Sequence, residues 1–167
     1  IAQGGIALMD GEGWYHEPEQ IGMETVWDKV HYNTRLGETT KWDFDKYIPQ
    51  VVIVAVGQND CHPEDYMKED YCQIKSRKWR EHYMDFLRKL RSVYKDANII
   101  CCTTLLNHDG AWDDAIAQVV KNMDDEKITQ YVFKRNGQGT PGHLRIPEAY
   151  EMAWELAGYI ETLDIVF

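Results

Sequence analysis

Apolar residues along this chain fall into two patterns, unbroken runs and helical repeats. Residues 51–56 (Val-Val-Ile-Val-Ala-Val) form an unbroken, mostly β-branched run, which predicts a strand buried on both faces, as in a parallel sheet covered by helices. Residues 97–105 and 128–133 predict two further strands. Between these strands, residues 76–94 and 112–123 carry apolar side chains at a spacing of about 3.6 residues, which predicts helices.

The rest of the chain gives shorter signals. A last helix is predicted over 147–161 and short helices over about 22–32 and 43–47, with a polar, acidic loop at 61–74. One face of the last helix is apolar and carries Tyr150, Ala153, Trp154, Ala157 and Ile160. Strands that alternate with helices in this way predict an α/β architecture, within a single domain that covers residues 1–167.

The composition narrows the function by exclusion. A formal net charge of −10 argues against a nucleic-acid binder, which would carry a basic surface. No apolar run approaches the roughly 18 residues of a membrane span, and the chain shows no signal peptide. The four cysteines fit no zinc spacing, so no metal site is predicted. Cys101 and Cys102 are expected to be buried free thiols, whereas a bridge between Cys61 and Cys72 stays open.

Polar residues follow the first buried run directly. Gln58, Asn59 and Asp60 stand at its carboxyl end, where parallel sheets place their ligands. The side-chain NH2 of Asn59 is suited to stabilise a developing oxyanion. The alternative is that Asn59 and Asp60 only form a turn or cap the next element.

Two further loops carry candidate chemistry. Gly4 and Gly5 offer backbone N–H groups with no side chain in the way, although they also suit an ordinary tight turn. His143 follows a glycine-rich loop and precedes a helix, where a histidine can act as general base and acid near neutral pH. The alternative for His143 is a surface imidazole with no catalytic role.

Taken together, three segments resemble blocks of the SGNH (GDSL-type) hydrolases. Residues 2–8 resemble the glycine block, residues 54–60 the Gly-x-Asn-Asp block, and residues 139–143 the histidine block. Trp42-Asp43-Phe44 makes the chain most similar to carbohydrate esterase family 2. The resemblance implies a flavodoxin-like, three-layer α/β/α fold with a parallel sheet and no cofactor.

The resemblance also implies roles for individual residues. The Gly4 N–H and the Asn59 side chain would form two arms of an oxyanion hole, with Gly5 in place of Gly4 if the register is shifted by one residue. His143 would take the proton from a serine nucleophile and return it to the leaving sugar hydroxyl.

The chain departs from the family pattern at two points. Its two serines, Ser76 and Ser92, fall within a predicted helix, so the serine block is absent. We therefore expect the first strand and helix to come from residues before Ile1 or from another chain, and the sheet to expose an unpaired flank. In addition, Thr140 stands where the family has an acidic residue, so a backbone carbonyl near residues 138–140 is expected to orient His143.

Several other residues are candidates for contact with a substrate. Trp14 and Trp112 are interpreted as loop aromatics that stack on a sugar ring, with packing against their own loops as the alternative. Asp60 and His62 follow Asn59 in the chain and are interpreted as substrate-binding residues. His108 and Asp109 come after the end of the second predicted strand and are interpreted as lining the same site.

The resemblance implies a serine-type acetyl esterase that acts on acetylated plant polysaccharide such as xylan outside the cell. This chain alone is expected to be inactive. The alternative is a non-catalytic carbohydrate-binding module on the same scaffold. A nucleotide binder is disfavoured because the chain has no Gly-x-Gly-x-x-Gly or Walker-type loop.

Overall fold

The computed structural model describes residues 6–13, 21–33, 37–38 and 40–165. The chain divides into two compact units, which are described separately. The first consists of Ile1–Ile48 and Asn59–Lys95, and the second of Pro49–Gln58 and Asp96–Phe167. The single domain expected over residues 1–167 stays a prediction.

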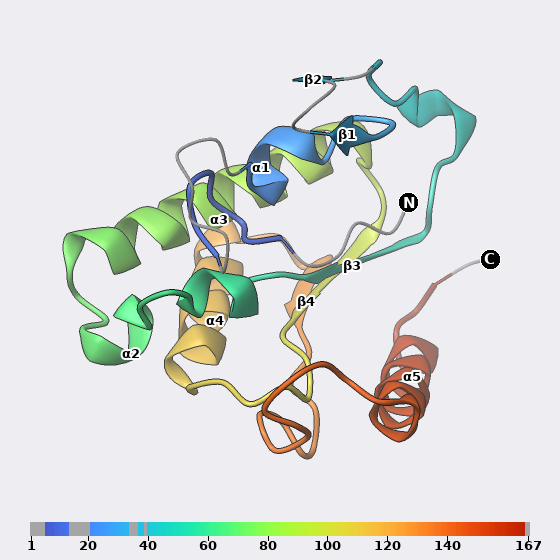
Figure 1. The fold of residues 1–167 in the computed structure, drawn as a ribbon. Helices are drawn as coiled ribbons and strands as arrows, with labels where there is room; N and C mark the ends of the chain where they lie inside the picture. Colours follow the sequence, from blue (N-terminus) through green and yellow to red (C-terminus); the bar gives the residue numbers. More distant parts are fainter. Residues whose placement is uncertain (1–5, 14–20, 34–36, 39, 166–167) are drawn as a thin grey trace. The chain divides into compact units, whose positions relative to one another are not determined.

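A parallel three-stranded sheet forms the centre of the second unit (Figure 1). Its strands are β3 (Val51–Ala55), β4 (Asn98–Cys102) and β5 (Ile128–Gln130), in the order β3-β4-β5. The register pairs Val54 with Cys101 and Cys101 with Gln130. The three predicted strands and their parallel arrangement are confirmed, although β4 and β5 are shorter than predicted.

The strand β3 is less buried than its sequence predicts. Among the described residues it pairs with β4 and with no other strand, and its Ile53 side chain is 49% exposed. Burial of this strand on both faces is therefore wrong for the chain as described. The apolar run correctly predicted a strand, and the open side agrees with the expected unpaired flank.

Two helices accompany this sheet. The helix α4 (Ala111–Met123) packs through a buried face of Trp112, Ala115, Ile116 and Val119. The helix α5 (Ile146–Glu161) packs Met152 and Leu156 against a small core of Cys102, Leu105 and Phe133. In the view of Figure 1, α4 lies to the left of β4 and α5 to its right.

The outer side of α5 carries large apolar residues that the core does not use. Tyr150 and Trp154 are 65% and 75% exposed, and Ile146 is 74% exposed. Because these residues are spaced by four, they form one stripe along the helix. The apolar face found in the sequence thus includes an exposed stripe, whereas Met152 and Leu156 face the core.

The long helix α3 (Ile74–Val93) organises the first unit, which also contains α1 (Met23–Val26), β1 (Tyr32–Asn33), β2 (Gly37–Glu38), η1 (Phe44–Lys46) and α2 (Tyr66–Glu69). Its buried face includes Trp79, Tyr83 and Phe86, spaced as the 3.6-residue rhythm predicts. The helix predicted over about 22–32 is too long, because beyond Val26 the chain pairs its backbone with the segment around Lys41.

The remaining sequence predictions concern cysteines and the membrane. All four cysteines are free thiols, with Cys101 and Cys102 buried as predicted. In the described part of the chain, no helix has the length and apolar character that crossing a membrane requires.

Candidate active site

Asn59 lies in a short turn that follows β3. Gly57, with φ of 123°, takes a backbone conformation that side chains disfavour and leads into the 3-10 turn η2 (Gln58–Cys61). The Nδ2 of Asn59 donates a hydrogen bond to the carbonyl oxygen of Ile6, at 3.2 Å. An amide NH2 has two N–H groups, and this bond fixes the amide. The part of the chain that the structure describes holds no acceptor for the second N–H, which is therefore suited to a ligand.

Asp60 connects the same turn to residues 8–9 through hydrogen bonds. Its side chain is fully buried and accepts hydrogen bonds from the backbone N–H groups of Leu8, at 2.8 Å, and Met9, at 3.2 Å. Burial raises the pKa of this carboxyl to about 7, although the backbone hydrogen bonds oppose the shift. Asp60 therefore holds residues 8–9 against the turn, and its interpretation as a substrate-binding residue is corrected.

The remaining candidates around Asn59 are only partly described. Gly4, Gly5 and Trp14 lie outside the described residues, although Ile6, which contacts Asn59, follows Gly5 directly in the chain. His62 is half-buried, and its carbonyl oxygen accepts a hydrogen bond from the N–H of Gly13, at 3.1 Å. Its contact with a substrate stays a prediction.

His143 belongs to the second unit, on the loop that precedes α5. The loop is held by two backbone hydrogen bonds, from Gly139 to the Leu105 carbonyl at 2.6 Å and from Asn107 to the Thr140 carbonyl at 2.9 Å. His143 is exposed, and no hydrogen bond of its ring is found among the described residues. The carbonyl of Gln138 is bonded to Arg135, so the expected orienting carbonyl is not observed at Gln138 or Thr140.

Trp112 is in the first turn of α4 and not in a loop. Its side chain has no exposed surface and contributes to the core. The interpretation of Trp112 as a sugar-stacking loop residue is therefore corrected. It packs in the core and not against its own loop, because it shares the buried face of α4 with Ala115, Ile116 and Val119.

Neither serine of the chain is placed as a nucleophile. Ser76 is buried in α3, where its hydroxyl lies 2.8 Å from the Asp70 carbonyl and 3.0 Å from the Tyr66 carbonyl. Ser92 donates to the Lys89 carbonyl of its own helix. Both observations agree with the absence of a serine block. Within the described ranges, no group of three or more His, Cys, Asp or Glu side chains could hold a metal ion.

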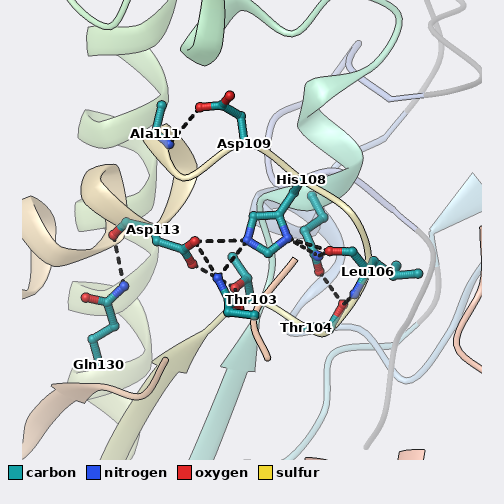
Figure 2. A network of polar contacts seen from close by, with 10 residues as sticks. Thr103, Thr104, Leu106, His108, Asp109, Ala111, Asp113 and Gln130 are labelled. Carbon is teal, nitrogen blue, oxygen red and sulfur yellow. Dashed lines mark hydrogen bonds and ion pairs between the residues drawn. The ribbon is translucent and has the colours of Figure 1, made fainter. Parts of the chain in front are cut away.

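A polar network that the sequence did not predict surrounds His108 (Figure 2). The His108 Nε2 lies 2.9 Å from Oδ2 of Asp113, and its Nδ1 lies 2.6 Å from the Leu106 carbonyl oxygen. Burial alone would lower the pKa of His108, but the bonds to Asp113 and Leu106 outweigh it and raise the pKa above its usual value. The His108 side chain has no exposed surface, so it does not line a ligand site as predicted.

The fold of this chain is similar to those of several solved carbohydrate esterases. Over 94% of the chain, the fold matches a family two carbohydrate esterase from Clostridium thermocellum in complex with cellohexaose, with a TM-score of 0.68 and 24% identity. It also matches an acetyl xylan esterase, Est2A, from Butyrivibrio proteoclasticus over 96% of the chain (TM-score 0.69, 22% identity) and a family two esterase from Cellvibrio japonicus over 95% (0.70, 18%).

The chain has the fold of the family 2 carbohydrate esterases. The α/β fold of the SGNH type that the three sequence blocks implied is thereby confirmed. The chain spans about half the length of these structures, 47%, 50% and 45% respectively.

The match found by sequence covers a smaller part of the chain. The cellulase/esterase CelE of Acetivibrio thermocellus is 36% identical over 62 residues, which are 37% of this chain and 7% of that protein. No family model matches the sequence.

Proposed function

We propose that this chain supplies the oxyanion-hole and general-base residues of a serine-type carbohydrate acetyl esterase, which removes acetyl groups from plant polysaccharide such as xylan. The observation that carries the proposal is Asn59, whose amide is fixed by the carbonyl of Ile6 within the glycine block. Its second N–H has no acceptor among the described residues and is proposed to donate to the substrate. The fold shared with family 2 carbohydrate esterases supports the same reaction. Its polymeric substrate implies an extracellular enzyme.

The proposed chemistry follows from these groups. A serine oxygen attacks the acetyl carbonyl carbon while His143 takes the serine proton, and the carbonyl electron pair moves to oxygen. The N–H groups of Asn59 and Gly4 donate to that oxyanion. Its collapse breaks the ester bond, and His143 gives its proton to the departing sugar oxygen, which leaves as a hydroxyl group. Water then attacks the acetyl-serine by the same route and releases acetate.

The serine is proposed to come from outside this chain. A strand and a helix that carry it would pair with the open side of β3 and cover the exposed stripe of α5. The exposed Ile53 and Trp154 support this arrangement, because large apolar side chains are rarely left uncovered together. With that segment, we place residues 1–167 in a single catalytic domain.

Hydrolysis of 4-nitrophenyl acetate by the full gene product tests the proposal. Asn59→Ala removes one oxyanion donor and should lower kcat about 100-fold or more, and His143→Ala removes the general base and should lower kcat at least as far. Asn122→Ala, at an exposed asparagine of α4, is the matched control and should keep the wild-type rate. Wild-type rates in both Asn59→Ala and His143→Ala would refute the assignment.

A non-catalytic carbohydrate-binding module is the second candidate. It is favoured by the exposed His143 ring, for which no orienting hydrogen bond is found among the described residues. Calorimetry with cellohexaose distinguishes the two functions. A binding module would retain its affinity after His143→Ala, lose affinity after Trp14→Ala, and show no hydrolysis, whereas an absence of any glycan binding would exclude it.

A further inference from the structure

The ring of His108 lies between two hydrogen-bond acceptors. Its Nδ1 is 2.6 Å from the carbonyl oxygen of Leu106, and its Nε2 is 2.9 Å from Oδ2 of Asp113. A carbonyl oxygen has no proton to donate, so Nδ1 has to carry one. Nε2 faces a carboxylate oxygen, which is also an acceptor, so the geometry suits a proton on each ring nitrogen.

Asp113 accepts several hydrogen bonds in this network. Besides His108, its carboxylate accepts from the Thr103 hydroxyl, at 2.8 Å, and from Nδ2 of Asn136, at 2.6 Å. Burial opposes a charge on His108, but the hydrogen bonds of Asp113 and Leu106 and the charges of Asp113 and Asp109 outweigh it and raise the pKa of His108. With an acceptor at each ring nitrogen, His108 is a buried imidazolium.

One group held beside this ring precedes the proposed oxyanion residue. The Oε1 of Gln58 accepts a hydrogen bond from the Thr104 hydroxyl, at 2.7 Å, and its Nε2 lies 3.4 Å from the Leu106 carbonyl and 3.0 Å from Nδ1 of His108. Asn59 is the next residue in the chain. The Leu106 carbonyl, which His108 binds, therefore also holds Gln58 at the end of β3.

A second group held beside the ring belongs to the loop that leads to His143. Nδ2 of Asn136 lies 3.1 Å from Nε2 of His108 while it donates to Asp113. Gly137 passes close to His108 with φ of 68°, and a Cβ at this position would lie 3.3 Å from the His108 carbonyl oxygen. His108 thus lies next to a residue that precedes each proposed catalytic side chain in the sequence, Gln58 before Asn59 and Asn136 before His143.

We propose that His108 is a positioning residue that acts through two shared acceptors. Its Nδ1–H holds the Leu106 carbonyl, which also binds Gln58 beside Asn59. Its Nε2–H holds the Asp113 carboxylate, which also binds Asn136 on the loop that leads to His143. The inference rests on the proposed esterase function. His108 does not touch the substrate, because its side chain has no exposed surface.

Loss of a proton from the ring would change one of these contacts. Nδ1 keeps the proton that the Leu106 carbonyl requires, so the proton lost is that of Nε2. A lone pair on Nε2 would then face Oδ2 of Asp113 across 2.9 Å, while Nδ2 of Asn136 would become a donor to Nε2. Asn136 would be drawn from Asp113 toward the ring. Since the pKa of His108 is raised above 6.5, its stabilising contribution is complete below pH 6.5 and is lost as the pH rises through the folded-state value.

Nitrogen NMR of the full gene product tests the charge directly. With ¹⁵N-labelled histidine, the His108 signals are identified by their loss in His108→Gln. We expect both ring nitrogens to be protonated at pH 6.5, the ordinary midpoint for histidine. An unprotonated ring nitrogen at that pH would overturn the proposal, and this readout does not depend on esterase activity.

The pH profile of kcat for 4-nitrophenyl acetate tests the positioning role. Wild-type kcat should fall on the alkaline side, and His108→Gln should remove that limb and lower kcat about 10- to 100-fold with little change in KM. His31→Gln, at an exposed histidine, should match the wild type. If His108→Gln keeps both the wild-type kcat and the alkaline limb, the positioning role is wrong.

The proposal stays testable if His108→Gln does not fold or if the wild type is inactive. If His108→Gln does not fold, Gln58→Met removes the amide and leaves the ring intact, so kcat should fall in the same way, and a wild-type kcat overturns the proposal. If the wild type hydrolyses no ester, the proposed function fails together with the positioning role, whereas the NMR result still tells whether the imidazolium exists.

Discussion

Asp60 is a fully buried carboxyl group held by the backbone N–H groups of Leu8 and Met9. Two donors favour its charged form, but the loss of solvent is the larger effect and raises its pKa from 3.8 to about 7. The folded protein therefore binds this proton more tightly than the unfolded chain. Between these two pH values, stability falls as the pH rises.

A substitution at this residue should remove that pH dependence. Wild-type protein is expected to lose free energy of unfolding, on the order of 4 kcal/mol, as the pH rises from 3.8 to about 7. Asp60→Asn cannot titrate, so its free energy of unfolding should change less over the same interval. Urea denaturation at a series of pH values measures both.

The matched control is Asp45→Asn, at an exposed aspartate of the same unit. It should keep the wild-type slope of stability against pH. A wild-type slope in Asp60→Asn would show that other groups cause the dependence. Asp60→Asn should also be less stable at low pH by about 1–3 kcal/mol, because its NH2 faces one of the two backbone N–H groups.

At the scale of single residues, the sequence shows which side chains are suited to a chemical role better than it shows how deeply each one is buried. Asn59 is a candidate because a side-chain amide follows an apolar strand, and the structure places this amide against Ile6, within the glycine block. The burial of Asp60 and of His108 depends on residues more than 40 positions away in the chain, at Leu8 and Gln58. A local pattern holds no information about such contacts.

At the scale of elements, periodicity predicted the helices α3, α4 and α5 to within two residues at each end. Helical periodicity reports which residues share a face, because that follows from 3.6 residues per turn. It does not report which of two apolar faces meets the core. For α5, Met152 and Leu156 pack inward whereas Tyr150 and Trp154 are exposed, and only the tertiary contacts with Phe133 and Leu105 decide this.

The loop before α5 depends on one glycine for its path. A Cβ on Gly139 would lie 2.5 Å from the carbonyl oxygen and 2.8 Å from the Cβ of Leu105, both too close. Gly139→Ala should therefore push the loop off Leu105 and break the hydrogen bond between the two residues. We expect a loss of about 2–4 kcal/mol in the free energy of unfolding, measured by urea denaturation, and a lower kcat through His143.

Gly142 in the same loop provides the comparison. A Cβ there would meet nothing within 4 Å, so Gly142→Ala should change stability by no more than about 0.5 kcal/mol. Equal effects of Gly139→Ala and Gly142→Ala would mean that the loop is not held by its approach to Leu105.

At the scale of the whole molecule, the second unit exposes two apolar surfaces. One is the open side of β3 at Ile53, and the other is the stripe of α5 that contains Tyr150 and Trp154. The chain also spans only about half the length of the structures that share its fold, 47% in one case and 50% in another. Both observations agree with the proposal that a further segment, with the serine, covers these surfaces.

Substitution of the exposed residues distinguishes a covered surface from one that faces solvent. In the chain of 167 residues alone, Ile53→Lys and Trp154→Lys should leave stability nearly unchanged and reduce self-association, because both side chains are 49% or more exposed. In the full gene product, the covering segment would bury them, so each substitution should lower the free energy of unfolding by about 3 kcal/mol. Val30→Lys is the control, since Val30 is also 49% exposed but lies in the other unit, and should have little effect on either protein. If Trp154→Lys and Ile53→Lys leave the full gene product as stable as the wild type, both residues face solvent there, and the serine-bearing segment has to bind elsewhere.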